Sequence, residues 1–168
     1  MTHPLVDQFR FTRRELMRGL AGVIEEDGAR CFGQMNCISW IVGHLACYEQ
    51  RTFLWRPQNI TLFPNLNEIF GFGAPMSAPS LKEMLEVWHA VAQAADLYLD
   101  TLTTEILLTE LLLDGKSVGQ TCGDALQRII YHYWIHMGEI SAIRQMIGGT
   151  SLPEYVGELE QEAPYRPG

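Results

Sequence analysis

The sequence predicts an all-α protein, organised as a four-helix bundle with a long loop between the second and third helices. Two observations predict this class. Long segments carry apolar residues three and four positions apart, which is the period of a helix, and turn signals separate these segments. The 168 residues suit one domain with a sizeable core. We expect residues 1–150 to form the bundle and residues 151–168 to be a C-terminal extension that packs on the bundle or trails from it.

The first half of the chain predicts two helices and the long loop. The first helix is expected over about residues 4–26, and the second over about residues 36–55, opening at Asn36, a common N-cap residue. Residues 56–79 follow with four prolines and many aromatic and aliphatic side chains. Loops of this length are usually functional or disordered. The apolar content predicts packing over the bundle, where the loop can cover a pocket.

The second half predicts the other two helices. The motif Ser80-x-x-Glu83 is a capping-box pattern that opens a helix reaching about Leu102. Residues 103–119 are less regular, and their Asp-Gly turn signal allows a short strand pair or an extended crossover. The fourth helix is expected over about residues 121–147, stopped by a pair of glycines, Gly148-Gly149.

The fourth helix is apolar on two sides. Ile130, Trp134 and Met137 are expected to face away from the side that carries its histidines. A helix that is apolar on both sides is buried on both sides. A second subunit is the simplest cover, so we expect a homodimer.

Composition excludes several classes of partner. The net charge of −8 argues against general affinity for nucleic acid or an anionic membrane surface. No run approaches the ~20 apolar residues of a membrane span, and the N-terminus lacks the pattern of a signal peptide. A cytoplasmic location is therefore expected. The four cysteines match no zinc-binding spacing and are expected to be reduced packing residues.

Three histidines are the most informative residues of the chain. His132 and His136 lie four positions apart on the fourth helix, so both imidazoles point from one face. His44, on the second helix, can join them through helix packing. Imidazole is costly to bury in an apolar stripe without partners, and three protein ligands leave open positions on a metal ion. These histidines are the predicted metal ligands.

Two other metal templates fit worse. A zincin requires H-E-x-x-H, and here Tyr133 holds the position of the glutamate. Ferritin-like di-iron sites require two E-x-x-H motifs, whereas this chain has one, Glu86-x-x-His89. His89 is therefore expected to be a surface or flanking residue.

Two further side chains are candidates for roles at the site. Glu139 can be a fourth ligand, an acceptor for an imidazole N–H, or a general base. The competing interpretation is a structural salt bridge to Arg10, Arg13 or Arg51. Tyr48, one turn after His44, can hydrogen-bond a ligand of the metal or simply pack in the core.

Two stretches carry a family resemblance. Residues 36–46 contain Gly-His-Leu-Ala around His44, and residues 131–140 contain His-x-x-x-His-x-Gly-Glu-Ile. In this order they resemble the DinB/YfiT-like superfamily of four-helix bundles with a three-histidine metal site. The resemblance implies the same three ligands, a divalent metal, often nickel or zinc, and frequently a homodimer.

The resemblance limits function less closely, because fold does not fix function. Relatives include thiol-dependent transferases and isomerases. The leading hypothesis is therefore transfer of a low-molecular-weight thiol to an electrophilic small-molecule substrate, with no nucleic acid or membrane partner. A metal-dependent hydrolase with Glu139 as base is a close variant. The alternative from another class is a non-catalytic metal- or ligand-binding protein related to stress.

Overall fold

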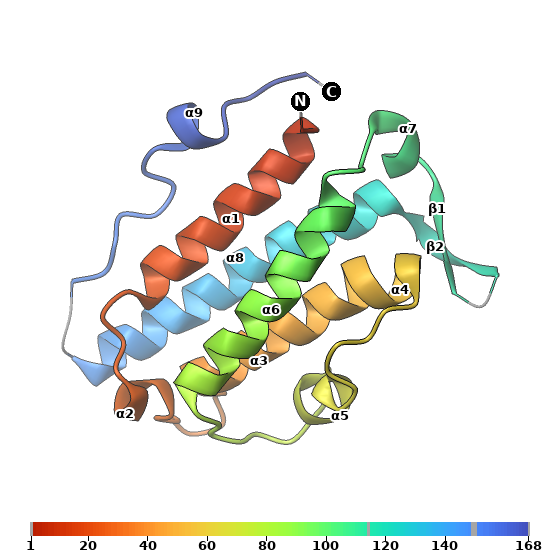
Figure 1. The fold of residues 1–168 in the computed structure, drawn as a ribbon. Coiled ribbons are helices and arrows are strands. Elements are labelled where there is room, and N and C mark those ends of the chain that lie inside the picture. The colour runs from red at the N-terminus through yellow and green to blue at the C-terminus, as the bar shows by residue number, and fades with distance from the viewer. Residues whose placement is uncertain (1, 114, 149–150, 168) are drawn as a thin grey trace.

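The computed structural model describes residues 2–113, 115–148 and 151–167, and these are mostly helical. Four long helical segments lie alongside one another and account for most of the chain (Figure 1). They are α1 (Pro4–Leu20), α3 (Ile38–Glu49) with its continuation η1 (Gln50–Trp55) and α4 (Arg56–Gln58), α6 (Leu81–Leu99) and α8 (Cys122–Ile147).

Shorter elements join the long helices. Of the two alternatives for residues 103–119, the strand pair is the one observed: β1 and β2 form an antiparallel hairpin with an irregular register near its open end. The hairpin stands close to α4 and the beginning of α8 (Figure 1). The short elements are α2 (Glu25–Gly28), α5 (Leu66–Phe70), α7 (Thr104–Leu107), β1 (Glu110–Leu113), β2 (Lys116–Thr121) and α9 (Leu159–Glu162).

The boundaries differ from the predicted ones for local reasons. α1 ends at Leu20, earlier than predicted, because the chain turns at Gly22, whose φ of +78° suits glycine. α3 begins at Ile38 with Cys37 at the N-cap position, so Asn36 lies outside the helix. The helical path then passes Pro57, which is tolerated because it lies in the first turn of α4.

Capping interactions fix the ends of the helix that carries two of the histidines. Thr121 and Asp124 form a reciprocal capping box, in which each backbone N–H donates to the other side chain at 3.0 Å or less. Gly148 ends α8 in the left-handed region, with φ of +80°. Gly149, the second predicted stop residue, lies outside the described residues. Local interactions therefore define both ends of α8.

The core lies between the four long helical segments. Its composition weakens one argument for a homodimer. Ile130, Trp134 and Met137 were expected to face away and to need a second subunit. Ile130 and Met137 are 8% and 2% exposed and pack in the core of this same chain, and the half-buried Trp134 packs against that core. The outward face of α8 instead carries Tyr131 and Ile135, each more than 60% exposed. The homodimer stays a prediction, without support from Ile130 and Met137.

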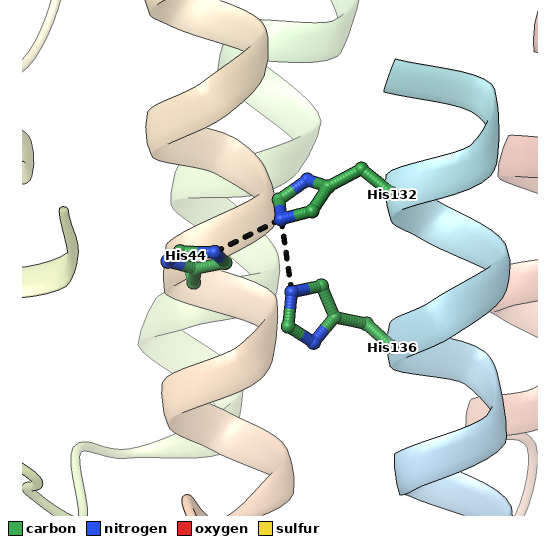
Figure 2. A group of neighbouring side chains, drawn as sticks. All are labelled: His44, His132 and His136. Atoms are coloured by element: carbon green, nitrogen blue, oxygen red, sulfur yellow. Dashed lines mark hydrogen bonds between the residues drawn. The ribbon is translucent and has the colours of Figure 1, made fainter. Parts of the chain in front are cut away.

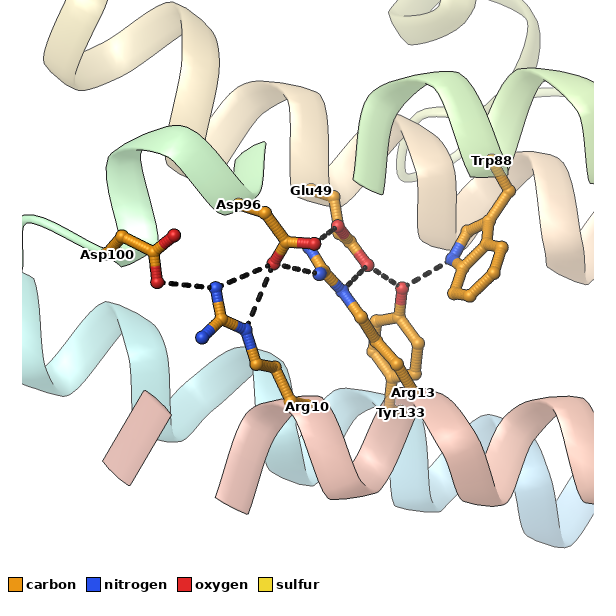
Figure 3. A network of polar contacts seen from close by, with 7 residues as sticks. All are labelled: Arg10, Arg13, Glu49, Trp88, Asp96, Asp100 and Tyr133. Carbon is orange, nitrogen blue, oxygen red and sulfur yellow. Dashed lines mark hydrogen bonds and ion pairs between the residues drawn. The ribbon is translucent and has the colours of Figure 1, made fainter. Parts of the chain in front are cut away.

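A polar network crosses this core (Figure 3). The Arg13 guanidinium on α1 donates two hydrogen bonds to the Glu49 carboxylate on α3, at 3.1 and 2.5 Å. The Tyr133 hydroxyl on α8 also donates to Glu49, and it accepts a hydrogen bond of 2.7 Å from Trp88 on α6. Arg10 extends the network outward to two aspartates of α6 and its C-cap, Asp96 and Asp100. One buried carboxylate thus connects all four long segments.

The C-terminal extension runs beside α1 (Figure 1). The backbone N–H of Val156 donates to Glu15 at 2.7 Å, and the Gln8 amide donates to the Ala163 carbonyl at 2.6 Å. Arg14 forms an ion pair with Glu162 of α9. The described part of the extension, residues 151–167, therefore packs on the helices. None of the helices in the described ranges combines the length and apolar character that a membrane crossing requires.

Candidate metal centre

Three imidazoles converge between α3 and α8. Figure 2 shows His44 projecting from α3 towards His132 and His136, which project from successive turns of α8. The Nε2 atom of His132 lies 3.1 Å from Nε2 of His44 and 3.0 Å from Nε2 of His136. The candidate ligand atoms all lie within 4.8 Å of one another. The three predicted ligands are therefore brought to one point.

The chain around His44 is shaped to hold this imidazole in place. The Nδ1 atom of His44 is 2.6 Å from the carbonyl oxygen of Phe70, at the end of α5. Gly43 makes the approach possible, because a Cβ there would stand 3.0 Å or less from the Phe70 ring and from Met84 of α6. The glycine of the Gly-His pair thus lets α5 pack closely enough to orient the histidine.

The hydrogen bonds of the three imidazoles determine where their protons lie. A carbonyl oxygen only accepts, so Nδ1 of His44 carries a proton and its Nε2 presents a lone pair. Nδ1 of His136 lies 2.6 Å from the Glu139 carboxylate, so in the neutral imidazole Nδ1 carries the proton and Nε2 presents a lone pair. His132 can donate one proton from Nε2, to one of these two lone pairs only. Its Nδ1 is buried and has no hydrogen-bond partner.

The cluster therefore has more Nε2 lone pairs than protons to share between them. A cation bound between the three Nε2 atoms would satisfy these lone pairs. Burial lowers the pKa of His44 to about 4 and that of His132 to about 3, and the charge of Arg51 acts in the same direction. Both imidazoles are neutral at pH 7, which is the form that binds metals. This cluster can hold a metal ion.

Aromatic rings surround the imidazoles. The indole of Trp40, one turn before His44, stacks on its imidazole with centroids 4.9 Å apart. The Tyr48 ring packs against His44 and His132 at 4.6 and 4.3 Å. Tyr48 is only half-buried and lines a cavity of about 300 Å³ beside His132, so it meets both the cluster and the space next to it.

Glu139 lies where it can act on the cluster through His136. Of the possibilities for this residue, its observed contact is that of an acceptor for an imidazole N–H. The salt bridge to an arginine is not the contact found. Arg10 and Arg13 bind Asp96 and Glu49 instead, and Arg51 forms no ion pair with Glu139 in the described ranges.

Other residues lie away from the cluster. His89 is exposed on α6, as expected. Cys47 is buried, which raises the pKa of its thiol, and it lines a cavity of about 420 Å³ that shares Arg51 and Arg56 with the cavity beside His132. Sequence reasoning missed the Phe70 carbonyl and Trp40. Of the arginines that line the cavity beside His132, it singled out Arg51 and missed Arg56 and Arg128. The four-residue spacing of Trp40 and His44 was the available signal for the stacked indole.

Comparison with known protein families identifies the family of this chain. No curated protein matches the chain. The model of the DinB superfamily matches residues 8–140, a range that contains all three histidines and most of the long helical segments. The chain belongs to the DinB superfamily.

Proposed function

We propose that this protein is a four-helix-bundle metalloprotein in which His44, His132 and His136 hold a divalent ion, nickel or zinc. We further propose that it transfers a low-molecular-weight thiol to an electrophilic small molecule. The observation that carries the proposal is the convergence of three imidazole Nε2 atoms on one point with too few protons to join them. Imidazole suits zinc and nickel alike.

Three protein ligands leave further coordination positions open, which is typical of catalytic rather than structural metal sites. When bound, the ion supplies Lewis acidity, which lowers the pKa of a thiol or water at neutral pH. In the transfer, the thiol releases its proton to solvent, its sulfur forms a bond to the electrophilic carbon, and the leaving group departs with the electron pair of the broken bond.

The chain itself prepares the site. The Phe70 carbonyl and the Glu139 carboxylate each hold an Nδ1 proton, which keeps the Nε2 lone pairs of His44 and His136 directed inward. The Trp40 indole covers one face of His44 and excludes water there. Tyr48 borders both the cluster and the adjoining cavity, so its hydroxyl is the candidate to hydrogen-bond the reacting thiol or electrophile.

Elemental analysis of the purified, untagged protein tests the metal site. We expect about one divalent ion per chain, and its loss in His44→Ala, His132→Ala and His136→Ala with the helical circular dichroism retained. His89→Ala is the matched control, because His89 is an exposed histidine outside the cluster. Metal-free wild-type protein after reconstitution with zinc and nickel would overturn the assignment.

A thiol-transfer assay tests the reaction. The reconstituted protein is mixed with glutathione, cysteine or another small thiol and a chromogenic aryl halide, and thioether formation is followed. We expect metal-dependent turnover that His44→Ala abolishes and Tyr48→Phe lowers. Full metal occupancy without turnover of any thiol would favour the non-catalytic metal-binding alternative.

A further inference from the structure

Beside the histidine cluster lies a cavity whose lining is unusually basic for an acidic protein. It has a volume of about 300 Å³ and is bordered by His132 and Tyr48. Three arginines reach it from different elements: Arg51 from η1, Arg56 from α4 and Arg128 from α8. A second cavity of about 550 Å³ adjoins it and shares His132, Arg128 and Gln120.

These three arginines have no acidic partner. Within residues 2–113, 115–148 and 151–167, none of them forms an ion pair or a side-chain hydrogen bond. The arginines of α1 differ, because each binds a carboxylate; they are Arg10, Arg13, Arg14 and Arg18. The protein has 20 acidic residues against 12 basic ones, so the absence of acids at this cavity is a local feature.

The arrangement is costly without a ligand. The Nε atoms of Arg51 and Arg56 are buried and have no hydrogen-bond partner. Unsatisfied buried donors are rare in proteins, and each costs stability. Burial and the charges of Arg51 and Arg128 lower the pKa of Arg56, so both neighbouring cations act on Arg56. Arg51 gains one compensating contact, its guanidinium lying 4.2 Å from the centre of the Tyr48 ring.

The nearby acid does not neutralise the group. Asp124 precedes Arg128 by one turn of α8 and lines the adjoining cavity. Its carboxylate accepts the hydrogen bond of the Thr121 N–H in the capping box. This hydrogen bond lowers the pKa of Asp124, and the charge of Arg128 contributes to the lowering. Asp124 therefore compensates Arg128 in part, but the two form no ion pair in the described part of the chain. The cluster of arginines therefore remains open to an anion from outside.

We propose that Arg51, Arg56 and Arg128 form a binding subsite for a small anion with at least two negative charges, a phosphate group or a pair of carboxylates. The inference rests on the proposed function, since the anion would be part of the thiol or the electrophile and would place it beside His132. Guanidinium groups recognise both chemistries through paired hydrogen bonds. A cavity of this volume suits a small molecule.

Isothermal titration calorimetry on the metal-free full chain tests the subsite apart from the metal. Inorganic phosphate and succinate are the two probes, and acetate is the singly charged comparison. We expect phosphate or succinate to bind at least about tenfold more tightly than acetate. Tighter binding of phosphate would assign a phosphate-bearing substrate, and tighter binding of succinate would assign paired carboxylates. Equal, weak binding of all three anions would overturn the proposal.

Arginine variants locate the binding. Arg56→Ala and Arg128→Ala should each weaken binding of the preferred anion about tenfold or more, while Arg128→Lys should lose less. Arg30→Ala is the matched control, because Arg30 is exposed, lacks an ion pair in the described ranges, and follows α2 at the other end of the molecule (Figure 1). Unchanged binding by both Arg56→Ala and Arg128→Ala would overturn the proposal.

Thermal unfolding separates a ligand-binding role from a structural one. Phosphate or succinate should raise the midpoint of the wild-type protein by binding the folded state. Arg56→Ala without anion should unfold at the same or a higher temperature, because a repulsion has been removed. A marked drop in this midpoint would show that Arg56 serves the fold and would overturn its assignment to the subsite.

The two proposals fail in different ways. The arginine variants should keep one metal ion per chain, whereas His44→Ala should lose the metal and keep anion binding. A wild-type protein that binds the anion but no metal would contradict the proposed function only. A wild-type protein that binds metal but no anion would contradict the subsite only.

Discussion

At the scale of single residues, the histidine cluster depends on two hydrogen-bond acceptors. Each of them contacts the Nδ1 atom of one imidazole. The Phe70 carbonyl fixes His44, and the Glu139 carboxylate fixes His136. Each selects the tautomer that leaves Nε2 free for a ligand bond. Such outer partners of metal-binding histidines commonly contribute about 10–100-fold to metal affinity.

This gives a prediction for Glu139. Replacing it with alanine removes the acceptor for the His136 N–H, so affinity for zinc should fall about 10–100-fold. Glu139→Gln keeps an oxygen acceptor without the charge and should show a smaller loss. Competition with a chromogenic chelator measures both affinities. Glu86→Ala, an exposed glutamate on α6, is the control, and an unchanged affinity in Glu139→Ala would contradict the positioning role.

At the scale of elements, the first turn of α6 is capped partly by a side chain from a distant part of the sequence. Ser80 caps the helix locally by accepting from the Glu83 N–H. The Glu25 carboxylate, on α2, accepts from the N–H groups of Leu81 and Lys82 at 2.8 and 3.1 Å. An acidic group at this end also suits the helix dipole. The first turn of α6 is therefore tied to the segment that follows α1.

Glu25→Gln should lower the free energy of unfolding at pH 7. Hydrogen bonds from Ser80 and from the backbone of Lys82 and Leu81 lower the pKa of Glu25 below its ordinary value. The stabilisation is therefore complete above pH 4.5 and is lost as pH falls through the lowered value.

Urea unfolding at pH 7 and at pH 3 measures this effect. The difference between wild-type protein and Glu25→Gln should shrink at the lower pH. Glu26→Gln, at an exposed neighbouring position, is the control and should differ little from wild type at either pH. A difference between wild type and Glu25→Gln that is independent of pH would contradict the capping role.

At the scale of the whole molecule, Glu49 connects the long helical segments (Figure 3). Its side chain is fully buried and accepts from Arg13 and Tyr133. Removing one partner of a buried ion pair leaves the other charge uncompensated, at a cost of about 3–5 kcal/mol. The network therefore makes assembly of these helices depend on one carboxylate.

Glu49→Ala should accordingly lower the free energy of unfolding by about 3–5 kcal/mol, because Arg13 is left buried without its main partner. Tyr133→Phe removes one hydroxyl from the same network and should cost about 1–3 kcal/mol. Arg14→Ala is the control, because Arg14 lies in an exposed pair with Glu162 and should cost less than about 1 kcal/mol. Urea unfolding measures all three. Equal stability of Glu49→Ala and Arg14→Ala would contradict the linking role.

The oligomeric state also belongs to this scale. The predicted homodimer should sediment at twice the mass of one chain. Tyr131 and Ile135 are the exposed apolar residues of α8 next to His132, and burying them in a dimer would be favourable. We expect Ile135→Asp to shift the protein to a single chain, and Leu97→Asp, at an exposed position on α6, to leave the dimer intact. A wild-type protein that sediments as one chain would contradict the prediction.

The sequence by itself determined the helical class, the approximate positions of the long helices and the three histidines. These follow from local rules: helical spacing of apolar residues, capping residues such as Ser80, and the one-turn separation of His132 and His136. The motifs around His44 and His136 also indicated the family, and the match to the DinB superfamily confirms that resemblance.

Only the tertiary structure decided which faces of the helices are buried and which distant residues contact one another. Ile130 and Met137 are buried because α8 packs against its own chain on more than one side, which helical spacing cannot distinguish from burial by another subunit. The partner of Glu139, the Phe70 carbonyl and the group formed by Arg51, Arg56 and Arg128 all depend on segments far apart in the chain. Their contacts are set by packing and hydrogen-bond satisfaction in three dimensions, which no local pattern encodes.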